Sequence, residues 1–442
     1  MQQTPSDEAA NLSRLTIELN EWDTVDPRRN PRLEKLTFAD RVQWRAFAES
    51  LRGKIDIHER YDGITIETTS FVGRVDVGPL RIVVRPKLPA MPLTHLLRYA
   101  YGLRDLRLIE ETRSPVNRDG MQDLLIVLLM GEIEELLHRG LARRYVSTDE
   151  RRTSPRGQIL VDTIIRRGGV IEAALPCRYY ERDTDWTLNR ILRTGLGVAA
   201  SMTGDRELRR RLQKLSVHFG DVSMMPRLRI EDIARAEQAL TRLTEASQSA
   251  LTLIRLLLEM QGVVLEHADG QSKTPGFLFD MNRFFEQLLS RFLGEHLVGA
   301  TVEDQRRIRG MFSSTSRRTP SPRPDYALVR GKRLQGFYDA KYRELWRSKL
   351  PTEWLYQLTV YALASPSTNS VLLYASMAAD PRDEEILIRQ PLVGTGKALG
   401  AVILRPVPLE RLAALVGAGA DAERVNARRR FAERLVSLSV ES

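Results

Sequence analysis

Cysteine is almost absent from this sequence of 442 residues, because Cys177 is the only one. A single thiol excludes an internal disulfide framework and any zinc site built from several thiolates. Long apolar runs are missing too: the longest, Leu124–Met130, falls far short of the roughly 20 residues that cross a membrane. The polar N-terminus lacks the basic and then apolar pattern of a secretion signal. These absences predict a soluble cytoplasmic protein with no membrane contact.

Lysine is scarce as well, and arginine carries most of the positive charge. Only 9 of the 67 basic residues are lysine, against 57 acids, and the net charge is +10. Guanidinium groups bind phosphate well, although we assign most of the arginine excess to a GC-rich genome. The distribution of charge along the sequence is more informative, because residues 301–350 hold 13 basic and 5 acidic side chains. This local cluster indicates a polyanionic partner, with a solvated loop face as the alternative.

The order of the patterns predicts a multidomain α/β protein. Residues 1–115 form a β-rich N-terminal domain, because Gly63–Thr68, Gly73–Pro79 and Leu80–Arg85 are typical of strands. We interpret residues 1–35 as a polar arm or loose lead-in. Residues 116–265 form a helical middle region, with apolar residues at three-and-four spacing. Its expected helices are Met121–Arg144, Thr187–Ala200, Glu207–Leu215 and the long amphipathic stretch Ile230–Gly262.

The pattern of residues 266–442 predicts a C-terminal α/β domain. A helix is expected over Phe277–Leu297, and Thr352 is expected to cap a second helix, Glu353–Ala364. Four short apolar segments have the length of strands: Tyr326–Val329, Leu334–Tyr338, Val371–Tyr374 and Ala401–Leu404. A C-terminal helix is expected after them. This order predicts a mixed sheet flanked by helices.

Two acids on consecutive expected strands carry the candidate chemistry. Asp325 follows Pro324 at the start of one strand, and Asp339-Ala340-Lys341 ends the next. Pairing these strands as a hairpin brings the two carboxylates together, and period-two geometry places Asp339 and Lys341 on one face. Two carboxylates and a backbone carbonyl suit Mg²⁺, and a nearby lysine can orient water or offset phosphate charge. A turn acid and a surface ion pair stay open as alternatives.

Two further polar residues belong with this group. Glu286 lies at the edge of the apolar stripe of the helix expected over 277–297, so its carboxylate can point toward a sheet end. Gln357 is polar within an otherwise apolar helix, and a buried amide needs hydrogen-bond partners. An ordinary helix-surface acid and an amide that caps a backbone group are the respective alternatives.

These residues resemble the PD-(D/E)xK nuclease pattern, and more narrowly the McrC family, the nuclease subunits of McrBC modification-dependent restriction systems. The resemblance covers about residues 50–410. Besides the residues above, it rests on the following segments: Ile82–Lys87, Arg139–Tyr145, Pro155–Gly157, Leu188–Leu192, Phe279–Glu286 and Leu355–Ala362. It implies a restriction-endonuclease-like fold for residues 266–442. In that fold Asp325, Asp339 and the carbonyl of Ala340 would bind Mg²⁺, and Asp325, Asp339, Lys341, Glu286 and Gln357 would be catalytic.

The resemblance also implies partners. McrC-like proteins act with an AAA+ GTPase ring, McrB-like, onto which residues 1–115 would dock and whose GTPase they would stimulate. The substrate would be double-stranded DNA, methylated or otherwise modified, and the ring would recognise the modified base. Within the basic stretch, Arg317, Arg318 and Arg323 are expected to contact DNA phosphates. The alternative function is a non-catalytic DNA-binding adaptor that activates an AAA+ NTPase.

Overall fold

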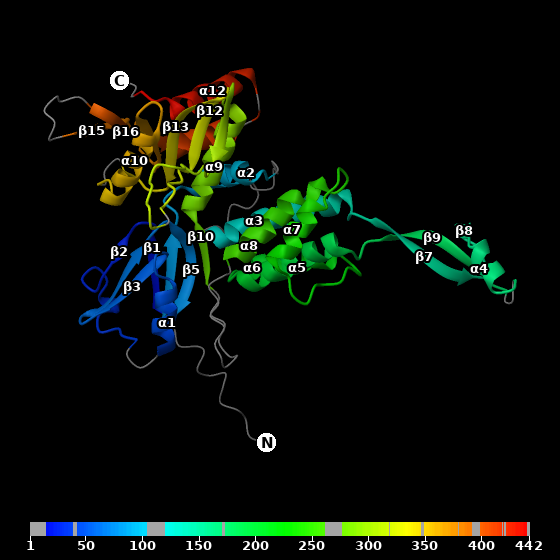
Figure 1. Ribbon diagram of the computed structural model, residues 1–442. Coiled ribbons are helices and arrows are strands. Elements are labelled where there is room, and N and C mark those ends of the chain that lie inside the picture. Colours follow the sequence, from blue (N-terminus) through cyan, green and yellow to red (C-terminus); the bar gives the residue numbers. More distant parts are fainter. Residues whose placement is uncertain are drawn as a thin grey trace. The chain divides into compact units, whose positions relative to one another are not determined.

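The chain folds into two compact units (Figure 1). One unit combines residues 1–105 with residues 263–442, and the other holds residues 106–262. The computed structural model describes residues 15–38, 42–103, 120–169, 173–260, 276–317, 319–345, 349–378, 380–390, 398–417, 419 and 421–439. The domain boundaries predicted at 115/116 and 265/266 lie outside these residues. No helix among them is long and apolar enough to span a bilayer.

The N-terminal part of the first unit is built on two small sheets. The first sheet has four strands, in spatial order β1 (Leu15–Asn20), β6 (Leu80–Arg85), β5 (Phe71–Val77) and β10 (Phe277–Asp280). The second sheet has three strands, in spatial order β2 (Thr24–Val25), β4 (Gly63–Thr68) and β3 (Ile55–Arg60). A 3₁₀ turn (Pro31–Leu33), α1 (Val42–Ser50) and α2 (Ala90–Tyr101) complete this part. The strands expected between residues 63 and 85 are therefore confirmed.

Two expectations about this part are wrong. Residues 15–33 are no loose lead-in, because β1 pairs in parallel with β6 and buries Ile17 and Leu19. The helix expected from Phe277 begins only at Met281, since residues 277–280 form an edge strand on β5. Asp280 fixes the boundary: its Oδ1 accepts the backbone N–H of Asn282 at 2.9 Å, as an N-cap residue does.

The C-terminal part of this unit is a six-stranded mixed sheet, as predicted. Its strands, in spatial order, are β11 (Ala300–Asp304), β12 (Tyr326–Arg330), β13 (Arg333–Lys341), β14 (Asn369–Ser376), β16 (Ala398–Pro408) and β15 (Glu384–Arg389). Strands β13, β14 and β16 run parallel, and the remaining pairs are antiparallel. The sequence patterns missed β11 and β15, which are half-exposed strands at the two edges of the sheet.

Helices cover both faces of this sheet. They are α9 (Met281–His296), α10 (Thr352–Ala364), α11 (Leu409–Val416) and α12 (Ala422–Val436). Along β13, Phe337 packs against Tyr361 of α10, whereas the next residue, Tyr338, donates to the carbonyl of Val436 in α12 at 2.7 Å. The single C-terminal helix expected is thus two helices. Thr352 is the first residue of α10 and makes no capping bond, so the expected cap is wrong.

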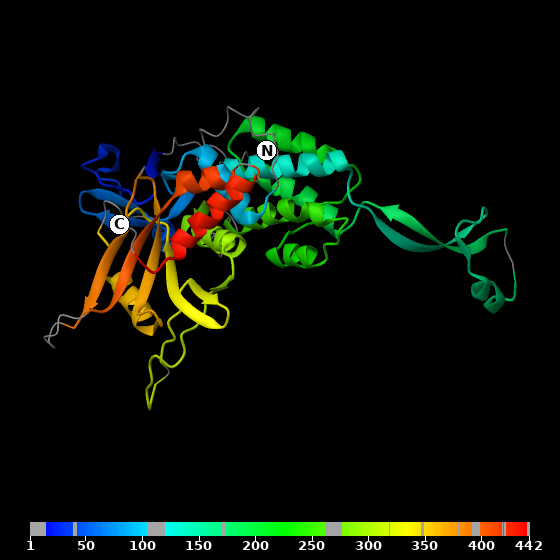
Figure 2. The same cartoon turned by 90° about the horizontal axis from the view of Figure 1, so that it is seen from above.

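The second unit combines a helical bundle with a β-arm. The helices are α3 (Met121–Arg139), α5 (Thr187–Met202), α6 (Arg206–Val217), α7 (Ile230–Gln238) and α8 (Gln248–Met260), with a 3₁₀ turn at Glu245–Ser247. The arm consists of β7 (Arg144–Arg152), β8 (Gln158–Ile159), α4 (Val161–Arg166) and β9 (Leu175–Asp183), and Figures 1 and 2 show it extending from the helices.

The middle region is therefore not helical throughout. The first expected helix ends at Arg139 rather than Arg144, because Gly140 follows it with a φ of 88°. The long amphipathic stretch Ile230–Gly262 contains two helices, which are separated between Gln238 and Gln248. Strands β7 and β9, which no pattern predicted, pair antiparallel and carry mostly exposed side chains. A strand is predicted from apolar and polar residues that alternate along the sequence, and strands whose side chains are mostly exposed show little of this alternation.

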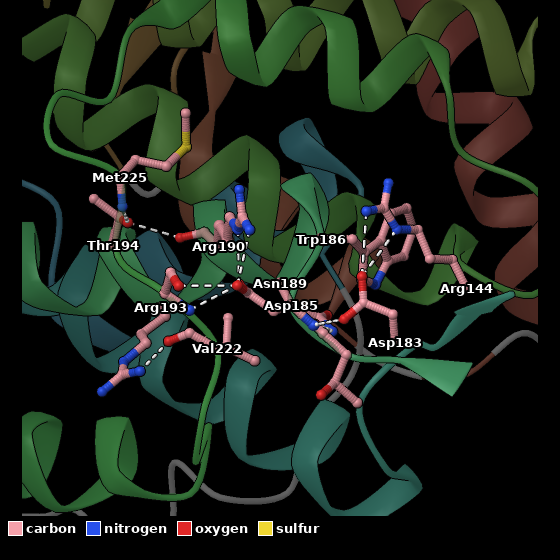
Figure 3. Close-up of polar contacts among 12 residues, drawn as sticks. Arg144, Asp183, Asp185, Trp186, Asn189, Arg190, Arg193, Thr194, Val222 and Met225 are labelled. Carbon is pink, nitrogen blue, oxygen red and sulfur yellow. Dashed lines mark hydrogen bonds and ion pairs between the residues drawn. The ribbon is translucent and has the colours of Figure 1, made fainter. Parts of the chain in front are cut away.

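The base of the arm is fixed to α5 by a polar network, and Figure 3 shows its contacts between Asp185 and Arg190. Asn189 is buried, and its amide donates at 2.8 Å to the carbonyls of Ala142 and Thr184, one at each end of the arm. The carboxylate of Asp185 accepts from Arg190 and from Ser223, and the Arg190 contact above all holds the pKa of Asp185 well below its usual range. Both chain ends of the arm are thereby bonded to one helix.

We expect Asn189→Ala to lower the free energy of unfolding by about 1–3 kcal/mol, because two carbonyls lose their donor. Urea unfolding followed by circular dichroism measures this change. Asn426→Ala, on an exposed face of α12, is the matched control and should change the free energy by less than about 0.5 kcal/mol. Equal effects of the two variants would show that the arm does not depend on this amide.

Candidate active site at the ends of β12 and β13

Antiparallel pairing of β12 with β13 brings the two predicted acids together. Tyr326 pairs with Tyr338, so Asp325 lies opposite the end of β13. Its Oδ2 accepts the backbone N–H of Ala340 at 2.8 Å. Both acids are nearly inaccessible to solvent, with 8% of Asp325 and 2% of Asp339 exposed. The predicted hairpin is confirmed, and it places two carboxylates at one buried strand end.

Lys341 lies among the oxygens of this strand end. Its Nζ is 2.6 Å from Oδ2 of Asp339, 3.8 Å from Oδ2 of Asp325 and 3.3 Å from the carbonyl oxygen of Ala340. Asp339 and Lys341 share a face of β13, as two residues separated by one position in a strand must. The surface ion pair considered from the sequence is therefore wrong, because this ion pair is largely buried.

Burial and nearby negative charge raise the pKa values of Asp339 and Glu286. Burial raises the pKa of Asp339 to about 7, the Asp325 carboxylate adds to the shift, and Lys341 opposes it. Burial also raises the pKa of Glu286 to about 7, again with a contribution from Asp325. For Lys341, burial lowers the pKa, but Asp339 and Asp325 outweigh it and raise the pKa above its usual value. Lys341 is thus an ammonium at neutral pH.

The two helical candidates lie on either side of these acids. Glu286 is half-buried on α9, where the hydroxyl of Tyr326 donates to its backbone carbonyl at 2.8 Å and joins α9 to β12. Gln357 is half-buried on α10, and its amide donates to the hydroxyl of Tyr361 at 2.7 Å. Burial, with smaller contributions from Asp339 and Asp325, raises the pKa of Tyr361 to about 12. The contact of Gln357 is thus with Tyr361 on its own helix, and the charge of the two acids reaches Tyr361.

The donor set fits a hard divalent cation held by few protein ligands. Among the described residues, no three side chains of histidine, cysteine, aspartate or glutamate gather to hold a metal. Two carboxylates and the carbonyl of Ala340 remain, which suits Mg²⁺ because this ion keeps several of its waters. Two observations support the fit. Oδ1 of Asp339 is buried with no hydrogen-bond partner among the described residues, and the Lys341 ammonium lies at the same oxygens as a cation would.

A basic loop leaves the sheet beside these acids. Residues 305–325 connect β11 with β12, and Figure 2 shows this segment projecting from the sheet. Its limbs are joined where Ile308 N–H donates to the carbonyl of Pro322 at 2.9 Å. Arg317 and Arg323 are exposed on the loop, whereas Arg318 lies outside the described residues.

Sequence reasoning missed Gln305 at the base of this loop. Its side-chain amide donates to Oδ1 of Asp325 at 3.0 Å, and its backbone N–H donates to the Asp325 carbonyl at 2.9 Å. Gln305 therefore fixes the orientation of a candidate metal ligand. The sequence offers no signal for this role, because the edge strand β11 that places Gln305 was not predicted.

Comparison with known proteins identifies the family to which this chain is similar. A family model described as "McrBC 5-methylcytosine restriction system component" matches residues 66–375, and no curated protein matches. One similar solved chain belongs to the refined half-complex of a tetradecameric assembly of Thermococcus gammatolerans McrB AAA+ hexamers with bound McrC. It is 20% identical with a TM-score of 0.64, over 95% of this chain and 100% of that chain.

A chain of the cryo-EM structure of the Thermococcus gammatolerans McrBC complex is 21% identical, over 64% of this chain and 88% of that chain, with a TM-score of 0.47. The match to the half-complex shows a shared mixed α/β multidomain fold. The family model covers well over half of the 442 residues. This chain therefore belongs to the family of McrBC 5-methylcytosine restriction system components.

Proposed function

We propose that this chain is the Mg²⁺-dependent endonuclease subunit of a modification-dependent restriction complex. The observation that carries the proposal is the buried group of Asp325, Asp339 and Lys341 at one strand end, beside the loop that bears Arg317 and Arg323. The order of acid, second acid and lysine along a hairpin supports a PD-(D/E)xK nuclease domain within residues 266–442. Membership of the McrBC family supports DNA as the substrate.

The raised pKa values of Lys341 and Glu286 support different chemical roles for these two side chains. Lys341 stays protonated beside two carboxylates, so it would offset negative charge that builds on the scissile phosphate rather than act as a base. Glu286, with a pKa near 7, would exchange a proton with a nearby water at neutral pH. Gln305 and the Ala340 N–H orient Asp325.

The same side chains would hold the metal. Asp325, Asp339 and the carbonyl of Ala340 would bind Mg²⁺, whose chemistry in such a site is to polarise a phosphoryl oxygen and lower the pKa of a bound water. Gln357, held by Tyr361 on α10, would stand at the edge of this group. Arg317, Arg318 and Arg323 would neutralise phosphates along the DNA and carry little sequence information.

We further propose an AAA+ GTPase ring as the partner. The solved half-complex contains McrB AAA+ hexamers with bound McrC, which supports the same kind of assembly for this chain. Following the resemblance, residues 1–115 would dock on the ring and stimulate its GTPase, and the ring would recognise the modified base. The side chains that would carry out the chemistry all lie outside residues 1–115.

We expect Asp339→Ala and Lys341→Ala to abolish cleavage of methylated double-stranded DNA, while binding to the ring and GTPase stimulation stay at wild-type levels. The reason is that both residues belong to the metal site. Cleavage and GTP hydrolysis are measured in parallel with the ring partner, GTP and Mg²⁺, and Lys332→Ala, an exposed lysine on the β12–β13 turn, is the control. Wild-type protein that stimulates GTP hydrolysis but never cuts would instead support the adaptor function.

We expect the triple variant Arg317→Ala, Arg318→Ala and Arg323→Ala to weaken DNA binding equally for methylated and unmethylated sequences. Each phosphate that the variant no longer neutralises should reduce the log–log salt slope by about 0.9, because fewer counterions are released. Binding across a salt series measures this slope.

A charge-matched control replaces three exposed arginines of α12: Arg424, Arg429 and Arg430. This control should keep the slope of the wild-type protein. An unchanged slope in the loop variant would mean that the loop does not contact DNA.

The pKa of Asp339 predicts how stability depends on pH in the metal-free protein. Its pKa rises from an ordinary value of 3.8 to about 7 on folding, so the folded state binds the proton more tightly. The stabilisation is therefore complete below about pH 4 and is lost as the pH rises through 7. Urea unfolding in EDTA at pH 5 and pH 8 should show a loss of stability that Asp339→Asn reduces by roughly 1–3 kcal/mol. Identical losses in the two proteins would contradict the shift.

A further inference from the structure

The residue that follows Lys341 is held from three sides. The backbone N–H of Tyr342 donates to Oδ1 of Asn282 at 2.9 Å, and its carbonyl accepts from the indole Nε1 of Trp22 at 3.0 Å. Its hydroxyl donates to Oε1 of Glu21 at 3.0 Å. Tyr342 is only 2% exposed. Two of these three bonds come from residues about 320 positions earlier in the chain, at the end of β1.

The turn that supplies these bonds is itself fixed. Trp22 has a φ of 57°, a left-handed conformation that a bulky side chain rarely adopts. Glu21 N–H donates to the carbonyl of Arg85 at 3.1 Å, and Oε1 of Glu21 accepts the backbone N–H of Lys87 at 2.7 Å. Strand β6 and the residues after it thus hold the turn in a conformation that directs the indole of Trp22 at Tyr342.

The same turn reaches the side chain of Arg343. The guanidinium of Arg343 lies 4.8 Å from the centre of the Trp22 ring and 5.8 Å from that of Trp354 in α10. The ammonium of Lys341 lies 6.0 Å from the Trp354 ring. Trp22 therefore contacts the backbone of one residue and the side chain of the next, directly after Lys341.

A second link joins α9 to the same sheets. Asn282 not only accepts from Tyr342 but also donates through Nδ2 to Oγ of Ser70 at 2.9 Å. The backbone N–H of Met281 donates to the carbonyl of Ser70 at 3.0 Å. Glu286 lies one turn further along α9. Two elements of the candidate site, β13 and α9, are thus anchored to residues 15–103.

We propose that Glu21 and Trp22 are positioning residues for the nuclease site, an inference that rests on the proposed function. Their bonds to Tyr342 fix the direction in which the chain leaves β13. This direction sets where the Lys341 ammonium lies relative to Asp339 and Asp325. The N-terminal sheets are therefore a structural part of the catalytic centre, and removing their bonds to Tyr342 slows the chemical step.

Trp22→Phe tests this role because it keeps an aromatic ring and removes the Nε1 donor. The matched control is Trp186→Phe, since Nε1 of Trp186 also donates to a backbone carbonyl, that of Ala142, at 2.9 Å. The full chain is assayed with the ring partner, GTP and Mg²⁺ on methylated DNA. Four quantities are measured: the single-turnover cleavage rate, the stimulation of the ring GTPase, the Kd for DNA and the Tm.

We expect Trp22→Phe to lower the cleavage rate about tenfold or more, since small misplacements of catalytic groups have effects of this size. The Kd for DNA should stay within about twofold, and the Tm should fall no further than in Trp186→Phe, which keeps the wild-type rate. A purely structural role would lower the Tm and leave the rate per folded molecule unchanged. Tyr342→Phe, which removes only the hydroxyl bonded to Glu21, should slow cleavage in the same sense.

Asp339→Ala separates the two proposals. If the wild-type protein cuts, Asp339→Ala does not, and Trp22→Phe cuts at the wild-type rate, the positioning role is overturned and the proposed function stands. If the wild-type protein and Asp339→Ala cut equally or not at all, the proposed function fails and the positioning role fails with it. A slow Trp22→Phe variant with unchanged Kd, Tm and GTPase stimulation supports both, whereas a matching loss of GTPase stimulation would assign Trp22 to docking and overturn the positioning role.

Discussion

Two carboxylates buried at one strand end repel each other, and the ammonium of Lys341 is the group that makes their burial tolerable. An isolated buried carboxylate would take up a proton, and the raised pKa of Asp339 shows how close this site is to that limit. The ion pair at 2.6 Å and the Ala340 N–H on Asp325 compensate in part. The divalent cation that we propose would add positive charge at these oxygens and stabilise both acids in their charged form.

The sequence predicted the centre of the site because its parts are local. Once the strands are recognised, the short hairpin that joins them fixes the distance between Asp325 and Asp339. The two-residue period of a strand then places Lys341 on the same face as Asp339. The apolar stripe of α9 likewise placed Glu286 at the edge of its buried face. Here local pattern and tertiary structure agree, and the mixed sheet followed from the order of elements.

The supporting residues could not be predicted because their partners are remote. Trp22 contacts Tyr342, which follows it by 320 residues in the chain, and the charged residues around its short strand are typical of a loose lead-in. Gln305 depends on an edge strand with little apolar contrast. The β-arm was not predicted for a related reason: β7 has no buried side chain, and only Cys177 and Tyr179 are buried in β9, so the apolar contrast is small.

The helical unit is inserted within the other unit, and this has a consequence for synthesis on the ribosome. Residues 1–105 emerge first, but the edge of their sheet is completed by β10, which follows about 170 residues later. The bundle and its arm lie between them in the chain and can finish folding while the first strands still wait for their neighbour. Lys341 emerges later still. The candidate site is therefore completed only after the inserted unit and β10 have been made, so its acids and lysine meet supporting sheets that can already be folded.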